Sequence, residues 1–155
     1  MEVSARIATA DDVHDVADLL ASARAAVDGE RGGEQWLATD APAAPTASEL
    51  GPAAERRWYV GCIDEVPIGV TACGPRQWRD GRVVVAIEVM FVVPGAREVG
   101  VGEALVDAVI DGARERGAAA VEALALPGQR ELKNLFERVG LVARAIVAHK
   151  SLGPA

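Results

Sequence analysis

The sequence predicts a mixed α/β fold, in which a mostly antiparallel sheet contains one parallel pair of strands. Residues 57–63 and 67–73 are short apolar runs joined around two polar residues, Asp64 and Glu65, a pattern typical of a hairpin. Residues 82–93 are almost continuously apolar, as expected for a strand at the centre of a sheet. A helical pattern over residues 103–116 joins that strand to a further apolar run, residues 118–126. A right-handed crossover of this kind makes the two strands parallel.

The first elements follow from alternation and capping. Residues 3–7 alternate between apolar and polar side chains and predict a short strand. Thr9 and Asp12 form a capping-box pattern with a shorter acid than usual, so a helix is expected over residues 11–27. Its apolar face repeats at helical spacing, with Val13, Val16, Ala17, Leu20, Ala23 and Val27.

Residues 28–55 differ in character, because glycine and proline punctuate a polar and alanine-rich segment. A loop of this length in a compact domain is functional or disordered. We expect a variable loop with a short helix over residues 35–38, where Trp36 either contacts a substrate or packs. Arg56 and Arg57, which follow it, are interpreted as a pair of charges flanking a strand.

The remaining elements complete one domain, residues 1–155. Asp64 and Glu65 form the hairpin turn, and residues 74–81 form the next turn. The last helix ends at Gly140, a typical C′ residue, and residues 143–150 are predicted as a closing strand. The apolar face of that helix contains Leu132, Leu135, Phe136 and Val139.

Composition excludes several classes of function. The chain of 155 residues has 23 acidic and 16 basic side chains, and its net charge of −7 argues against binding to nucleic acid or to an anionic membrane. Cys62 and Cys73 are too few for a disulfide framework and lack metal-site spacing. No signal peptide or membrane-spanning run is visible. We therefore expect a cytoplasmic protein with reduced cysteines and no metal.

The most informative segment is the turn at residues 97–102, because it lies between the central strand and a helix. Glycines at positions 100 and 102 let the backbone approach a ligand closely. The unpaired N–H groups at a helix N-terminus, together with the helix dipole, favour an anion. The segment thus predicts a site for a phosphorylated cofactor.

Two known phosphate motifs fit this segment poorly. A P-loop requires Gly-Lys-Ser/Thr, but Gly102 is followed by Glu103. The dinucleotide fingerprint requires a third glycine, where this chain has Leu105. Glu122 lies about 20 residues downstream, as that motif prefers, but too few residues follow for a doubly wound fold. A dinucleotide-dependent oxidoreductase is therefore the least favoured of the three functions considered, after the two described below.

A third pattern rests on resemblance to a family. Val92-Val93-Pro94, followed by Arg97-Glu98-Val99-Gly100-Val101-Gly102, resembles the central motif of the GNAT superfamily of N-acetyltransferases, V-x-P and then R/Q-x-x-G-x-G/A. Leu135-Phe136-Glu137-Arg138-Val139-Gly140-Leu141 is similar to its second signature, roughly L-Y-E-x-x-G-F. The order of elements also matches, so the resemblance covers essentially the whole chain.

The resemblance implies six to seven strands, about four helices and an acetyl-CoA site. Backbone N–H groups of residues 98–103 would bind the CoA pyrophosphate, and Arg97 would position the phosphates. The central strand would splay from its parallel neighbour after Val92, which frees strand edges for pantetheine. The residues implied for the cofactor are Met90, Val92, Arg97, Glu98, Val99, Gly100, Val101, Gly102, Glu103, Asn134 and Phe136.

Glu88 is the candidate general base, because it is the only acid within the central strand and burial should raise its pKa. The sequence leaves open whether it faces the site and acts through a water, or faces away and pairs with an arginine or solvent. Phe136 stands where many relatives have a tyrosine that protonates the leaving thiolate. Tyr59, the only tyrosine, belongs to another strand.

We therefore expect an acetyl-CoA-dependent N-acetyltransferase that transfers the acetyl group directly to a primary amine. The acceptor is a small molecule, a peptide or a protein, and the acidic composition favours a cationic one. Direct transfer is expected because no activated Cys or Ser lies in the motifs. A homodimer is compatible with the fold. The alternative is a catalytically degenerate acyl-CoA-binding module.

Overall fold

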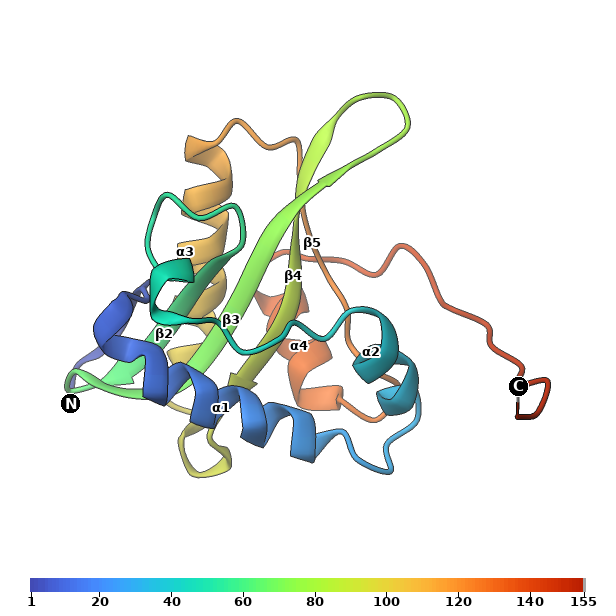
Figure 1. Ribbon diagram of the computed structural model, residues 1–155, viewed down its shortest axis with the longest axis horizontal. Coiled ribbons are helices and arrows are strands. Elements are labelled where there is room, and N and C mark those ends of the chain that lie inside the picture. Colours follow the sequence, from blue (N-terminus) through green and yellow to red (C-terminus); the bar gives the residue numbers. More distant parts are fainter. Residues whose placement is uncertain (155) are drawn as a thin grey trace.

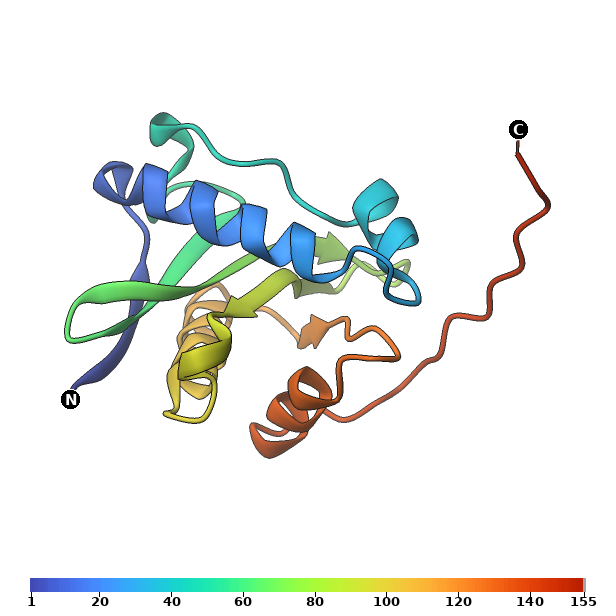
Figure 2. The same cartoon turned by 90° about the horizontal axis from the view of Figure 1, so that it is seen from below.

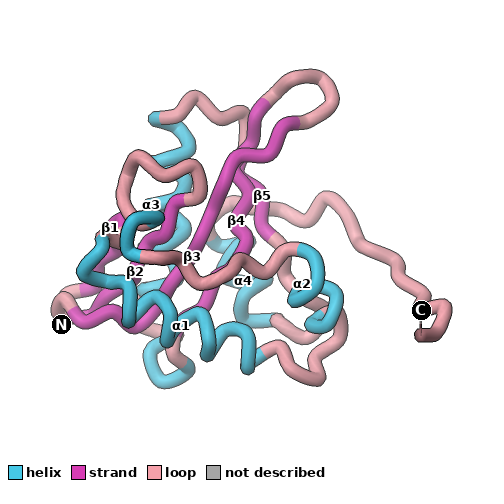
Figure 3. Tube along the Cα trace, in the orientation of Figure 1, coloured by secondary structure: helices cyan, strands magenta, loops and turns pink. Residues whose placement is uncertain are grey.

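The computed structural model describes residues 1–154, which form one five-stranded sheet with helices on both faces (Figures 1 and 3). The strand order is β1-β2-β3-β4-β5, and only the β4–β5 pair is parallel. This confirms the predicted fold class. The elements are β1 (Val3–Ile7), α1 (Val13–Ala26), α2 (Gly33–Thr39), β2 (Arg57–Ile63), β3 (Val66–Gln77), β4 (Val83–Val92), α3 (Val101–Glu115), β5 (Val121–Ala123) and α4 (Arg130–Arg138), with short 3₁₀ helices at Ala10–Asp12, Ala47–Glu49 and Pro94–Ala96.

The helices divide between the two faces of the sheet. Figure 2 shows α1 and α2 on one side, and α3 and α4 on the other. Each side has its own apolar cluster: Val16, Leu20 and Trp36 belong to the first, and Leu105, Val109 and Phe136 to the second. Burying these clusters is the main force that holds both layers on the sheet.

The β2–β3 hairpin confirms the predicted turn. Asp64 and Glu65 connect the strands with φ values of 47° and 69°. Positive φ at both central residues defines a type I′ turn, whose twist matches that of the flanking strands. The Asp64 Oδ1 accepts a hydrogen bond of 2.7 Å from the Glu2 backbone N–H, which ties the chain start to this turn.

Strand β3 is longer than predicted, because it continues through Gly74 and Pro75 to Gln77. Pro75 lies opposite Val85, whose backbone N–H donates to Ala120 on the other side. The N–H and C=O groups of one strand residue point to the same neighbouring strand, and those of Val85 point away from β3. The pair of Pro75 and Val85 therefore needs no N–H donor from Pro75. The predicted turn at residues 74–81 is therefore confined to its last part.

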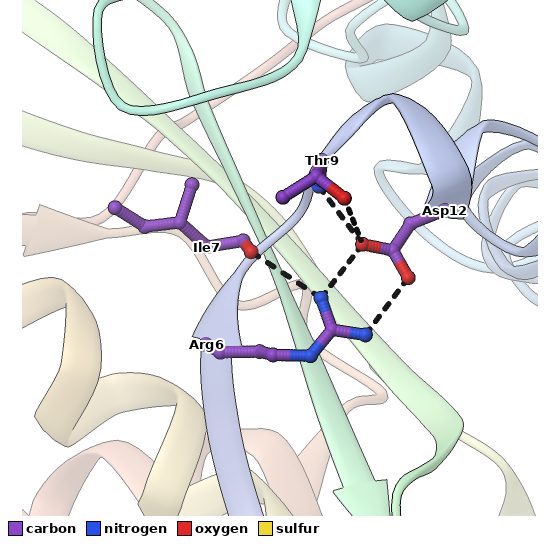
Figure 4. A network of polar contacts seen from close by, with 4 residues as sticks. All are labelled: Arg6, Ile7, Thr9 and Asp12. Carbon is purple, nitrogen blue, oxygen red and sulfur yellow. Dashed lines mark hydrogen bonds and ion pairs between the residues drawn. The ribbon is translucent and has the colours of Figure 1, made fainter.

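The start of α1 is held by a polar network (Figure 4). The Asp12 Oδ2 accepts a hydrogen bond of 2.8 Å from the Thr9 N–H, as the capping-box pattern predicts. Arg6 in β1 also donates to both Asp12 oxygens, at 2.7 and 2.9 Å. The Arg6 hydrogen bonds hold the pKa of this buried carboxyl below its usual range.

The predicted closing strand over residues 143–150 is wrong, which explains five strands instead of six to seven. Gly140 ends α4 as predicted, with φ 95°. Beyond it the chain is extended and leaves the body of the molecule (Figures 1 and 2). The open sheet edge nearest in topology, β5, is only three residues long, and Ile146 is 95% exposed. An alternating segment becomes a strand only when an edge pairs with it.

Candidate active site

The sheet opens at its parallel pair. β4 and β5 pair only from Val85–Val121 to Ile87–Ala123, and beyond this point they separate. The separation thus begins at Ile87, and the prediction that it begins after Val92 is wrong. A cavity of about 830 Å³ lies there and receives lining residues from both faces of the sheet. Ala23, Glu30 and Trp36 line it on the α1 side, and Gly102, Asn134 and Leu135 on the α3 side.

A β-bulge in β4 prepares the edge of this cavity. Ala72 pairs with Val89 and Cys73 with Ile87, so Glu88 is an extra residue on β4. The bulge reverses which residues face β5: the Val85 N–H points toward β5, whereas the Val93 N–H bonds to Ile68 in the opposite direction. By alternation, the backbone groups of Met90 and Val92 point into the gap. The bulge therefore turns these backbone groups toward the gap, where the Val92 carbonyl accepts a hydrogen bond from the Arg97 Nε.

Glu88 combines both orientations that the sequence left open. Glu88 is a lining residue of the cavity, and its side chain is 21% exposed. At the same time its two oxygens accept hydrogen bonds from the Arg56 Nε, at 2.8 Å, and Nη2, at 3.0 Å. The Glu88 carbonyl accepts a bond of 3.0 Å from the Trp36 indole N–H. One residue at the bulge is thus held through both its backbone and its carboxylate.

The turn before α3 has the geometry expected of an anion site. Gly100 is the N-cap of α3 and has φ 94°, a value that side chains disfavour. The first hydrogen bond into the helix runs from the Ala104 N–H to the Gly100 carbonyl, at 3.0 Å. The N–H groups of Val101, Gly102 and Glu103 precede it and have no carbonyl acceptor within the helix. Gly102 and Glu103 line the cavity.

Glycine is needed at positions 100 and 102 of the turn for different structural reasons. No heavy atom lies within 4 Å of a Cβ built on Gly100, so this position requires glycine for its φ. A Cβ on Gly102 would lie 2.7 Å from Leu135 Cδ2. Gly102 therefore lets α4 pack closely on the first turn of α3, besides exposing its N–H.

Charged side chains around the turn are paired with one another. The Arg97 Nε donates to the Val92 carbonyl at 2.9 Å, and its guanidinium lies 5.6 Å from the Phe91 ring centroid. Glu103 pairs with Arg138 at 2.6 Å. Burial is the largest single influence on the pKa of Glu103 and raises it. The Arg138 hydrogen bonds, the backbone N–H of Glu103 itself and the Arg138 charge together outweigh burial, so the net pKa is lowered. Both arginines line the cavity and can exchange these partners for phosphate oxygens.

The structure brings together most of the predicted cofactor residues. Seven of the eleven line the cavity: Met90, Val92, Arg97, Glu98, Gly102, Glu103 and Asn134. Val101 is fully buried, Phe136 packs in the α3-side apolar cluster, and Val99 is exposed. The sequence did not indicate Glu30, Leu124 or Leu126 as lining residues, and no local motif marks them.

Nucleophiles and acids other than carboxylates are sparse at this site. Among the described lining residues there is no Tyr, Cys or Ser. Tyr59 is buried, and its hydroxyl would be 2.5 Å from a Cβ on Gly112. Cys73 is buried too, and desolvation raises the pKa of its thiol to about 11. Within residues 1–154, no group of three or more His, Cys, Asp or Glu side chains could hold a metal ion.

No helix among the described residues is both long and apolar enough to span a bilayer. This finding comes from the helices of residues 1–154 alone. The longest of them, α3, has 15 residues, which is short of the length that a spanning helix requires.

Comparison with known proteins agrees with this architecture. A solved ribosomal-protein-alanine N-acetyltransferase from Brucella melitensis biovar Abortus 2308 is similar, with a TM-score of 0.68, 19% identity and 99% coverage of both chains. An aminoglycoside acetyltransferase from an uncultured soil metagenomic sample has a TM-score of 0.72, 16% identity and 100% coverage of both. The aminoglycoside N-acetyltransferase AAC(6')-Iy in complex with CoA has a TM-score of 0.70, 18% identity, and coverage of 98% of this chain and 96% of that one.

At these low identities, the structural similarity shows the fold alone. No curated protein matches the chain. The family follows from a different comparison. The model of the acetyltransferase (GNAT) family matches residues 19–141, well over half of the chain, including the β4–α3 turn and α4. The chain therefore belongs to the GNAT family of acetyltransferases.

Proposed function

We propose that this protein is an acetyl-CoA-dependent N-acetyltransferase that transfers an acetyl group directly to a primary amine, with residues 1–155 acting as one domain. The main supporting observation is the cavity at the β4–β5 separation. Its lining includes both Gly102 and Glu103 from the first turn of α3 and Glu88 from β4. This is the pairing of an anion site with a base that such a transfer requires.

The residues present fit a CoA molecule. The N–H groups of Val101, Gly102 and Glu103 would bind the pyrophosphate, and Arg97 would add a charge-assisted contact. The backbone groups of Met90 and Val92 face the gap, where they would bind an extended pantetheine as a neighbouring strand would. Acetyl-CoA, when bound, supplies the activated acetyl thioester. The similar structure of AAC(6')-Iy was solved in complex with CoA.

The base and the oxyanion support each have a candidate in the chain. Glu88 would take the proton from the amine through a water, since amines attack only when neutral. The backbone near Val92 would support the developing oxyanion. No tyrosine among the described residues lines the cavity, so the thiolate would leave without help from that side chain. Thiols with a pKa of about 8–9 are adequate leaving groups.

The acceptor half of the cavity favours a cationic amine. The charged lining residues contributed by α1, its following loop and β4 are Glu30 and Glu88, both acidic. Two of the similar structures are aminoglycoside acetyltransferases. The second candidate, an acyl-CoA-binding module without turnover, is favoured by the lack of a tyrosine among the described lining residues and by the buried position of Phe136.

The test begins with calorimetric titration of the protein with acetyl-CoA, and with CoA and NADH as comparison ligands. Micromolar binding of acetyl-CoA, without binding of NADH, is the expected result. An amine screen that measures release of the CoA thiol then separates transferase from binding module. Binding without turnover for any amine would leave the module, and the absence of acetyl-CoA binding would overturn both.

A further inference from the structure

Arg56 holds the carboxylate of Glu88 from outside the cavity. It lies immediately before β2, 32 residues from Glu88 in the chain, and its side chain is 47% exposed. Nε donates to one carboxylate oxygen at 2.8 Å and Nη2 to the other at 3.0 Å. Among the described residues, those that line the cavity include Glu88 but not Arg56. The guanidinium therefore contacts Glu88 without reaching the space open to substrates.

This contact determines the orientation of the carboxylate. Two parallel N–H···O bonds from a planar guanidinium fix both the direction and the plane of a carboxylate, which one bond or a lysine would not. Gly74 lies beneath it: a Cβ there would be 3.4 Å from Oε1 and 3.9 Å from the Arg56 Cα. The hydrogen bonds to Glu88 raise the pKa of Arg56 although burial opposes them, so its charge is secure.

The pairing leaves acceptor sites on the Glu88 carboxylate free. An ionised carboxylate has about four lone-pair sites, and Arg56 occupies two of them. The backbone of the same residue is held separately, by the Trp36 N–H on its carbonyl. Because the bulge already gives Glu88 an irregular backbone, these two contacts replace the strand pairing that would otherwise fix it.

We propose that Arg56 is a positioning residue for the reaction: it orients the Glu88 carboxylate toward the cavity without touching the substrates. This inference rests on the proposed function, in which Glu88 is the base. It assigns a role to a residue whose position in the sequence indicates only a charge beside a strand.

The experiment is a double-mutant cycle on kcat, with KM measured for acetyl-CoA and for the best amine of the screen. Arg56→Gln is expected to lower kcat about tenfold, within the range of coupling between contacting side chains. KM for acetyl-CoA should stay unchanged, and Arg56→Lys should restore part of kcat, because it keeps the charge but loses the fork. In a Glu88→Gln background, Arg56→Gln should have no further effect.

Arg82→Gln is the matched control, since Arg82 pairs with Asp80 at 2.8 Å in the β3–β4 turn, away from the cavity lining. It should leave kcat unchanged, and thermal melts should show that all variants fold. An equal loss from Arg56→Gln in both backgrounds, or no loss in the parent, would overturn the positioning role. If Glu88→Gln is itself as active as the parent, the base assignment of the proposed function fails, and the role of Arg56 fails with it.

Discussion

The two halves of the cavity are built in different ways. The half next to α3 and α4 offers backbone N–H groups from one turn, and its charged side chains include the ion pairs Glu103–Arg138 and Arg97–Glu131. The half next to α1 and α2 offers side chains gathered from distant segments, above all Glu88 at the bulge. The first half can recognise any ligand with a pyrophosphate, whereas the second depends on a few individual side chains. Binding of cofactor and turnover of acceptor should therefore be separable by mutation.

The largest expected effect is that of Glu88→Gln, which removes the base and keeps the side-chain size. kcat should fall by about 10²–10⁴, the usual contribution of a general base. The Kd for acetyl-CoA should not change, because Glu88 belongs to the acceptor half. Glu115→Gln, an exposed glutamate at the end of α3, is the matched control. Full activity of the Glu88 variant would show that the amine loses its proton by another route.

A smaller effect is expected for Arg97→Gln on the other half. Loss of a charge-assisted contact to phosphate is worth about 1–3 kcal/mol, so the Kd for acetyl-CoA should rise roughly tenfold or more. The kcat at saturating acetyl-CoA should stay close to that of the parent. Since the contact is electrostatic, the difference between variant and parent should shrink at high salt. A constant Kd would mean that Arg97 remains bound to the Val92 carbonyl in the complex.

The next effect distinguishes backbone from side chain within the α3 turn. Gly100→Ala places a Cβ at φ 94°, which costs about 1–2 kcal/mol, without meeting any atom within 4 Å. A turn that relaxes to avoid this strain misplaces its N–H groups, so we expect roughly fivefold weaker acetyl-CoA binding by calorimetry. Gly95→Ala, also in open space but without positive φ, is the control. Equal Kd values for the two variants would contradict a role for the Gly100 conformation.

Gly102 is less suitable for this test than its place in the motif suggests. A Cβ at position 102 meets Leu135 at 2.7 Å, so Gly102→Ala disturbs the packing of α4 on α3 as well as the ligand site. A weakened Kd would then have two explanations. The structure thus identifies Gly100 as the position where the change in binding reports the backbone alone.

The difference between the halves also explains what the sequence could predict. The α3 turn, the Asp64-Glu65 hairpin and the Gly140 helix end depend on neighbouring residues, so local patterns indicate them correctly. The bulge at Glu88 and its bond to Arg56 depend on the register of two strands and on a segment 32 residues away. No local pattern contains that information, and the orientation of Glu88 therefore stayed open.

The predictions of a longer β5 and of a strand over residues 143–150 were wrong for a related reason. Apolar composition predicts that a segment can be a strand, but pairing requires an edge in reach. β5 loses its partner where β4 diverges, after Ala123, although the apolar run continues to Leu126. The cavity lies at that divergence, and two residues that depart from the predicted strand, Leu124 and Leu126, line it.

The smallest expected effect on either half comes from Asp12→Asn, because the network of Figure 4 lies outside the cavity. Arg6 and Thr9 would lose a charged acceptor, and the free energy of unfolding at neutral pH should fall by about 1–3 kcal/mol. Kd for acetyl-CoA and kcat should match those of the parent. Asp11→Asn, an exposed neighbour in the same 3₁₀ helix, should change neither stability nor activity.

The pH dependence of that loss tests its cause. The pKa of Asp12 is lowered in the folded state, first by the Arg6 hydrogen bonds and then by Thr9. A lowered pKa stabilises the fold above the unfolded value, about 3.9 for aspartate, and the stabilisation disappears as the pH falls through the folded pKa. Urea unfolding of parent and Asp12→Asn should therefore differ fully at pH 7 and converge below pH of about 4. A difference that persists unchanged in acid would attribute the loss to packing, and not to the charge that Arg6 and Thr9 hold.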